Sequence, residues 1–329
     1  MKIACPISSP EEVEMLAENG AEEVYCGLTP KEWFSRYNIA LWLNRRSPRG
    51  ANVLSYEALA QLVEGAHRYQ IPVFLTANAH YYTQEQQALV LDLTRRAVEI
   101  GVDALIVGDP ALILALREAG IDIPLHISAL GTCFNAETAS FYKDLGASRV
   151  ILPRELSLDG IRRIVAKVKD LIDCEAFILN DGCVYTEGFC LTTHSVGQAF
   201  CYRDWSYAFH SAGGVRAQTE RERLAEHYKH YREWIWYVNG CGCSVSHRGF
   251  QNGPCGLCAI KPLYDMGVTS IKIVGREAPS LRKLLSLKLV KTVVDRVRTE
   301  ASEEEMTALS RSLRDTPGLC DSGYMCYYR

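Results

Sequence analysis

The sequence lacks both a long hydrophobic segment and an excess of charge of one sign. No run of about eighteen apolar residues occurs, so we expect no transmembrane helix. Its 36 basic and 39 acidic side chains give a formal net charge of −3, which offers no overall attraction to nucleic acid or to an anionic membrane. The first residues show no apolar segment behind a basic stretch, so we expect no secretory signal and predict a cytoplasmic protein.

Several signatures of nucleotide binding and of hydrolysis are also missing. The sequence contains no Gly-x-Gly-x-x-Gly fingerprint and no Walker phosphate loop. It also contains no Gly-x-Ser-x-Gly nucleophile elbow. Dinucleotide binding, P-loop phosphoryl transfer and α/β-hydrolase chemistry therefore have no support in the sequence.

What the sequence does contain is a regular alternation of short apolar segments with helical ones. The apolar segments fit strands buried on both faces of a parallel sheet. They are Lys2–Pro6, Glu23–Gly27, Pro72–Asn78, Ala104–Gly108, Pro124–Ala129, Arg149–Leu152, Glu175–Leu179 and Ser270–Val274. The segments between them carry a helical period and often end in Gly. Eight such units predict a TIM-type (β/α)8 barrel. A doubly wound open sheet is the alternative, because periodicity does not reveal whether a sheet closes.

Two regions interrupt this alternation. Residues 32–52 are rich in Trp and Arg, and we predict that they form a loop at the barrel mouth. Residues 182–255, after the seventh strand, are predicted to be a cysteine-rich metal-binding insertion. The barrel is then assigned to residues 1–181 and 256–300, with a C-terminal tail at 301–329. Within the insertion we expect a polar helix that exposes its two histidines, His227 and His230.

The segment 183–258, which covers the insertion and the start of the following barrel segment, contains seven of the thirteen cysteines: Cys183, Cys190, Cys201, Cys241, Cys243, Cys255 and Cys258. In a reducing compartment, clustered thiols more often bind metal than form disulfides. Thiolates select zinc or an iron–sulfur cluster. The last four could form a zinc site by themselves, because zinc favours closely spaced cysteine pairs. The first three need a fourth ligand, and a 4Fe–4S cluster completed by a later cysteine is the simplest solution. Four others, Cys5, Cys26, Cys133 and Cys174, are expected to be core thiols, although Cys26 could face the mouth.

Polar residues finish most of the predicted strands. In a barrel, the carboxyl ends of the strands and the loops after them form the active site. The residues expected there are Asn78, Asp109, His126, Ser128, Arg154, Glu155, Asn180, Lys272 and Arg276. Asn78, His126, Arg154 and Glu155 are the candidate catalytic residues, while an ion pair between Arg154 and Glu155 is the structural alternative. The arginines suit a ligand that carries carboxylates.

Two blocks of the sequence resemble the collagenase-like peptidase family U32. The first reads Glu175-x-Phe177-x5-Cys183-x4-Gly188-x-Cys190, and the second is Met266-Gly267-Val268-x-Ser270-x-Lys272-Ile273-x-Gly275-Arg276. The segments 19–27 and 152–157 add to the likeness. The resemblance implies a TIM-like barrel. It also implies either a peptidase or an oxygen-independent hydroxylase that binds a 4Fe–4S cluster, takes oxygen from prephenate, and acts on ubiquinone precursors or on uridine and cytidine in RNA.

By that resemblance, Cys183, Cys190 and Cys201 are cluster ligands, and we predict Cys241 as the fourth. Cys243, Cys255 and Cys258 remain as other candidates, or as part of a second site for zinc or another cluster. Arg154, Lys272 and Arg276 are the predicted ligands of prephenate. The resulting prediction is an oxygen-independent hydroxylase of a small molecule or an RNA nucleoside, with a related partner subunit left open. The alternatives are a peptidase and a non-catalytic binding module stapled by zinc.

Overall fold

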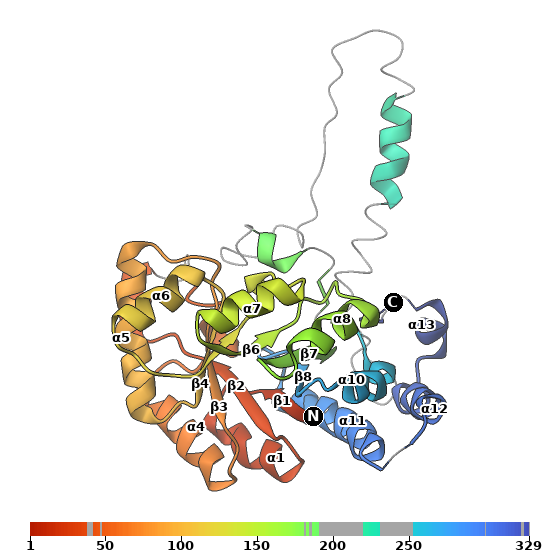
Figure 1. Ribbon diagram of the computed structural model, residues 1–329, viewed down its shortest axis with the longest axis horizontal. Helices are drawn as coiled ribbons and strands as arrows, with labels where there is room; N and C mark the ends of the chain where they lie inside the picture. The colour runs from red at the N-terminus through yellow and green to blue at the C-terminus, as the bar shows by residue number, and fades with distance from the viewer. Residues whose placement is uncertain are drawn as a thin grey trace.

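The computed structural model is a closed barrel of eight parallel strands surrounded by helices (Figure 1). Each strand pairs with the next, and β1 pairs with β8, which closes the ring. The strands are β1 (Lys2–Pro6), β2 (Glu23–Gly27), β3 (Val73–Ala77), β4 (Ala104–Val107), β5 (Leu125–Ile127), β6 (Ala147–Ile151), β7 (Asp173–Leu179) and β8 (Ser270–Ile273). All eight predicted strands are confirmed, and the closure excludes the open sheet.

The structure describes residues 1–37, 42–46, 48–180, 182–183, 186–190, 220–230, 253–299, 301–323 and 326–328. The α-helices are α1 (Val13–Glu18), α2 (Lys31–Tyr37), α3 (Pro48–Ala51), α4 (Tyr56–Arg68), α5 (Gln84–Ile100), α6 (Pro110–Glu118), α7 (Ala136–Asp144), α8 (Leu158–Val168), α10 (Ile260–Met266), α11 (Ser280–Val297), α12 (Glu303–Arg314) and α13 (Pro317–Ser322). Short 3-10 turns are η1 (Pro10–Glu12), η2 (Ala129–Gly131), η3 (Glu187–Phe189) and η5 (Leu257–Ala259). Residues 220–230 are also helical, and His227 and His230 are exposed on them as predicted.

The region 32–52 was predicted to be a loop, and that prediction is wrong in part. Helix α2 occupies its beginning and the short α3 its end. Trp33 and Tyr37 lie four residues apart, and their ring centroids are 4.8 Å apart. Such a pair stabilises one face of a helix. Trp33 is also buried, so tertiary packing supports a helix that the polar composition did not indicate.

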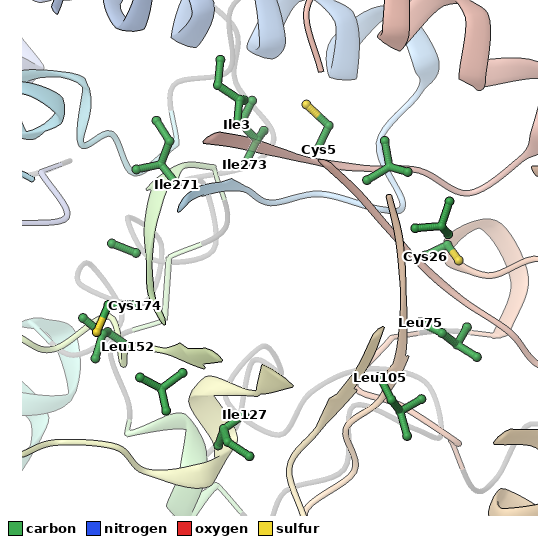
Figure 2. Packing of buried hydrophobic residues seen from close by; sticks show 14 of the residues in the cluster. Ile3, Cys5, Cys26, Leu75, Leu105, Ile127, Leu152, Cys174, Ile271 and Ile273 are labelled. Carbon is green, nitrogen blue, oxygen red and sulfur yellow. The ribbon is translucent and has the colours of Figure 1, made fainter. Parts of the chain in front are cut away.

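The strands alternate their side chains between two separate cores. One set points away from the barrel axis, toward the surrounding helices, and includes Cys26, Leu75, Leu105 and Ile127 (Figure 2). The other set fills the barrel interior: Tyr25, Phe74, Ala104, Ile106, Ala129, Ile151, Phe177 and Val274. Burial on both faces explains the nearly continuous apolar strands.

The four cysteines expected in the core are indeed buried: Cys5, Cys26, Cys133 and Cys174. All four belong to the outer core. Cys26 therefore packs between sheet and helices and does not face the mouth. Burial raises the pKa of the Cys26 thiol to about 12, which keeps it protonated.

The C-terminal tail packs against the end of the barrel. Helix α12 contacts α11 and η5. The Tyr327 backbone N–H donates to the Cys255 carbonyl at 3.0 Å. The Tyr328 hydroxyl donates to the Phe177 carbonyl of β7 at 2.5 Å. The tail thus ends beside β7, at the barrel mouth. Across the described ranges, no helix is long and apolar enough to cross a membrane.

Candidate functional site

A cavity of about 90 Å³ lies at the carboxyl ends of the strands. The charged side chains that line it are five cations and a single carboxylate: Arg45, Arg46, Arg154, Lys272, Arg276 and Glu187. Tyr25, Ile106 and Phe177 of the inner core form part of its floor. The cavity is therefore electropositive with an aromatic base, an arrangement that suits an anionic ligand.

Arg276, three residues beyond the end of β8, is buried and is held by neutral oxygens. Its Nη1 donates to Thr76 Oγ1 at 2.8 Å and to Asn52 Oδ1 at 3.2 Å. Its Nη2 donates to Asn44 Oδ1 at 3.1 Å. Within the described chain no carboxylate forms an ion pair with it, and burial lowers its pKa to about 10. A buried cation without an anionic partner has electrostatic capacity left for an anion.

The backbone of β2 leaves room for this guanidinium because residue 27 is glycine. A Cβ built on Gly27 would lie 1.7 Å from Asn52 Oδ1 and 2.2 Å from Arg276 Nη1. These separations are far below contact distance, so any side chain at position 27 would displace the arginine. The glycine is therefore needed for the close approach of Arg276 to the strand.

Beneath the cavity, a second set of charges is fully paired. Arg149 of β6 binds both oxygens of Glu23 at 2.8 Å and Glu175 Oε2 at 3.0 Å. Lys272 Nζ donates to Glu175 Oε1 at 2.7 Å and lies 3.8 Å above the centre of the Tyr25 ring. Burial would raise the pKa of Glu175, but Lys272 and Arg149 outweigh it and hold that pKa at about 2. Lys272, predicted to bind the ligand, thus reaches the cavity while already paired.

Arg154 follows β6, lines the cavity and is also paired. It forms an ion pair with Glu187 of η3, and its guanidinium carbon lies 3.8 Å from the centre of the Phe177 ring. Burial would lower the pKa of Arg154, but Glu187, Tyr327 and Cys183 together raise it. The structural alternative was an ion pair between Arg154 and Glu155. Arg154 instead pairs with Glu187, and Glu155 is exposed.

His126 on β5 lies inside the barrel rather than at the cavity surface. Its ring meets Phe74 edge to face, with centroids 4.6 Å apart. Burial, and then the positive charge of Arg149, lower its pKa to about 3. Its Nδ1 has no hydrogen-bond partner among the described residues. His126 is therefore neutral at physiological pH, and proton uptake by it is strongly disfavoured.

Of the remaining strand-end residues, two line the cavity together and two stabilise the fold. Asn78 lines the cavity and donates to Ser128 Oγ at 3.1 Å, which lies beside it in the wall. Asp109 caps α6 by accepting from the Ala111 N–H at 2.9 Å. Asn180 donates to Ser286 Oγ at 3.1 Å. The cavity therefore gathers Asn78, Arg154, Lys272 and Arg276, but not Glu155.

Two of the predicted cluster ligands lie near residues that line this cavity. Cys183 is near enough to affect the pKa of Arg154, and Cys190 ends η3, which carries Glu187. Turn η3 packs on η2, and His80 Nε2 lies 2.7 Å from the Glu187 carbonyl oxygen. Cys201, Cys241 and Cys243 fall outside the described residues. Cys255 and Cys258 line a different cavity beside the tail.

Several functional residues were not predicted. Glu23, Arg149 and Glu187 build the charge pattern, and Asn44, Asn52 and Thr76 hold Arg276. One signal was present in the sequence. Glu23 and Arg149 are charged residues within apolar strands. Glu23 lies two positions before Tyr25 and therefore on the same face of β2, and Tyr25 faces inward. Asn44 and Asn52 gave no such signal, since they reach the site only through the chain's path after β2.

Comparison with known proteins places these features in context. The sequence model of peptidase family U32 matches residues 8–329. tRNA hydroxylation protein P from Escherichia coli (strain K12) is 31% identical over 172 residues, which are 52% of this chain and 34% of that protein. tRNA hydroxylation protein P2 from Bacillus subtilis (strain 168) is 26% identical over 84% of this chain and 86% of its own length. The 23S rRNA 5-hydroxycytidine C2501 synthase of E. coli is 36% identical over 43% of this chain and 21% of that enzyme. The chain spans 34% of the length of the E. coli tRNA hydroxylation protein, 38% of that from Haemophilus influenzae (strain ATCC 51907 / DSM 11121 / KW20 / Rd) and 58% of tRNA hydroxylation protein P1 from B. subtilis.

Proposed function

The chain belongs to peptidase family U32, and we propose that it is an oxygen-independent hydroxylase of a pyrimidine nucleoside in RNA. The observation that carries the proposal is the electropositive cavity at the barrel mouth, with Arg276 lacking a carboxylate partner within the described chain and with Cys183 and Cys190 beside it. Relatives named for tRNA hydroxylation and for rRNA 5-hydroxycytidine synthesis supply the substrate class. Binding of RNA at this site does not require a net positive charge on the whole protein, because Arg45 and Arg46 line the cavity.

We propose a 4Fe–4S cluster held by Cys183, Cys190, Cys201 and Cys241. Cys183 and Cys190 support this role, because they lie on either side of Glu187 in the sequence and Glu187 pairs with Arg154 at the cavity. When bound, such a cluster would supply one-electron redox chemistry beside the substrate. The protein's own contribution is to place it against a cavity whose walls are already fixed by ion pairs.

The co-substrate that we propose is prephenate, which carries two carboxylates. Arg276 is the first candidate to bind one of them, since its guanidinium is planar, charged and bound only to neutral oxygens among the described residues. Arg154 is rigidly oriented by Glu187 and by the Phe177 ring, and would contact the second. Lys272 would add positive potential from below, while Glu175 keeps it in place.

Peptidase activity is the alternative, and the described site gives it less support. A serine peptidase needs a histidine that accepts the proton of the nucleophile. The pKa of His126, at about 3, makes it too weak a base for that task at neutral pH. Ser128, in the wall of the cavity, accepts a hydrogen bond from Asn78 and caps η2.

The test is an anaerobic assay of the full chain reconstituted with iron and sulfide. Unmodified tRNA and rRNA transcripts are incubated with protein and prephenate, digested, and searched by mass spectrometry for nucleosides that have gained one oxygen atom. We expect hydroxylated uridine or cytidine that requires prephenate. Absence of product with every RNA, together with cleavage of a peptide substrate, would contradict the proposal and favour the peptidase.

A pair of glycine variants tests the role of the cavity itself. Gly27→Ala places a methyl group where Arg276 and Asn52 now lie, so we expect product formation to fall by roughly tenfold or more. Gly65→Ala is the matched control, because its Cβ would meet only Val13 at an ordinary distance of 3.4 Å. Equal activity of the two variants would remove Arg276 from the binding site.

A further inference from the structure

A second cavity, of about 230 Å³, lies between the barrel and the C-terminal tail, and four cysteines line it. Two of them, Cys255 and Cys258, form a Cys-x2-Cys pair just before α10. The other two, Cys320 and Cys326, come from the tail more than sixty residues later. Sequence spacing alone joined the first pair to Cys241 and Cys243, so the tail pair is a contribution that only the fold reveals.

The backbone fixes these four residues around the cavity. Cys255 forms a β-bridge with Leu179 on one side and with Cys326 on the other. The Tyr327 N–H donates to the Cys255 carbonyl at 3.0 Å, which ties the two strands together. Cys258 is on η5, and helix α12, which precedes Cys320, packs on η5. The four residues thus meet through ordinary secondary structure and not through a single loop.

We propose that Cys255, Cys258, Cys320 and Cys326 bind an iron–sulfur cluster, a second metal centre distinct from the one at the barrel mouth. Four cysteine thiolates are the usual ligands of a 4Fe–4S cluster. Two arginines, Arg311 and Arg314, also line the cavity. Their charge would offset the negative charge of a cluster with four thiolates.

The size of the cavity favours a cluster over a single zinc ion. Zinc–sulfur bonds of about 2.3 Å bring tetrahedral thiolates to about 3.8 Å from one another. No three Cys, His, Asp or Glu side chains in the described part of the chain converge in the way that one ion requires. The four cysteines instead surround an open space. An iron–sulfur core lies between its thiolates and keeps them farther apart, so it fits this arrangement.

The proposed cluster would also attach the C-terminal tail to the barrel. The tail reaches the barrel mouth through Tyr328, which donates to Phe177, and Tyr327 packs on the inner core. A cluster bound between Cys255 and Cys326 would fasten this end of the tail beside β7. Its loss should therefore make residues after α12 more accessible to protease than they are in the intact protein.

Iron and sulfide analysis of the full chain, reconstituted and handled without oxygen, tests the proposal. With clusters at both centres the wild type should contain about eight iron atoms per chain. Cys320→Ser/Cys326→Ser should contain about four, and so should Cys183→Ser/Cys190→Ser. Cys174→Ala, which removes a buried core thiol that lines neither cavity, is the control and should retain the wild-type content.

Three results would overturn the second cluster. The first is a tail variant that keeps all the iron of the wild type, and the second is one that loses one zinc ion per chain and no iron. The third is loss of all the iron on substitution of either cysteine pair, which would mean a single shared centre. If the tail variant does not fold, the variant Cys183→Ser/Cys190→Ser decides the question. It should keep about four iron atoms and the signal of one cluster in electron paramagnetic resonance, whereas an iron-free protein refutes the proposal. Because none of these measurements uses RNA or prephenate, they are independent of the proposed hydroxylase activity.

Discussion

The barrel interior contains two sets of cations that differ in what neutralises them. In the lower set, Arg149 and Lys272 share the carboxylates of Glu23 and Glu175, and every one of these side chains is nearly or fully buried. In the upper set, Arg276 is equally buried but is bound by Thr76, Asn52 and Asn44. A buried charge that is paired serves the fold, whereas one held by neutral groups stays able to attract an anion.

Removal of one carboxylate from the lower set should have the largest effect. Glu23→Gln leaves Arg149 with Glu175 alone, which Lys272 already shares. Breaking a buried pair in this way costs about 3 kcal/mol or more of unfolding free energy. Urea unfolding measures it. Glu64→Gln is the control, because Glu64 pairs with Arg68 on an exposed helix face and should change stability by less than about 0.5 kcal/mol. A loss below about 1 kcal/mol for Glu23→Gln would show that the lower set does not stabilise the barrel.

Arg276→Met should reverse this pattern by lowering function without lowering stability. Each oxygen that accepts from Arg276 keeps a second hydrogen bond: Asn52 Oδ1 accepts from Asn44, Asn44 Oδ1 accepts from the Arg46 N–H, and Thr76 Oγ1 donates to the Cys26 carbonyl. Loss of the charged guanidinium also removes its desolvation cost, so unfolding free energy should change by less than about 1 kcal/mol.

Binding of prephenate should respond differently from stability in this variant. A hydrogen-bonded charge pair contributes up to about 3 kcal/mol, so affinity measured by calorimetry should fall by roughly 100-fold. The opposite result, a large loss of stability with unchanged affinity, would assign Arg276 to the fold and erase the difference between the two sets.

The two sets also differ in how far the sequence predicted them. Each strand was predicted because Val, Ile and Leu fill short segments bounded by Gly and Pro, and strand formation depends on these local features. Arg276 and Lys272 were predicted as site residues because they end or follow a strand. The pairing of Arg149 with Glu23 was not, since it joins β6 to β2 across the barrel and only closure of the sheet brings them together.

The tail shows the same limit at a larger distance. Cys320 and Cys326 have no ligand partner nearby in sequence that matches a common motif, and residues 301–329 were predicted only to be a C-terminal tail. Packing of α12 on η5 places them beside Cys255 and Cys258. Long-range contacts of this kind are set by the whole fold, so a reading of local pattern could not find them.

Substitution of His126 has the smallest expected effect and is the most selective test. The pKa of its ring depends on burial and on the charges of Arg149, Glu175 and Lys272. Its pKa of about 3 lies below the ordinary value of about 6.5, so the folded protein prefers the neutral ring. Between these two values the unfolded chain binds more protons than the folded one, and stability must therefore fall as the pH is lowered. By linkage, the loss from pH 7 to pH 5 is about 2 kcal/mol. Urea unfolding at the two pH values should show this dependence in the wild type and in the control His227→Gln, which alters an exposed histidine, but not in His126→Leu. If His126→Leu retained the full dependence, another titrating group would be its source, and burial and the charge of Arg149 would not be what lowers stability at acid pH.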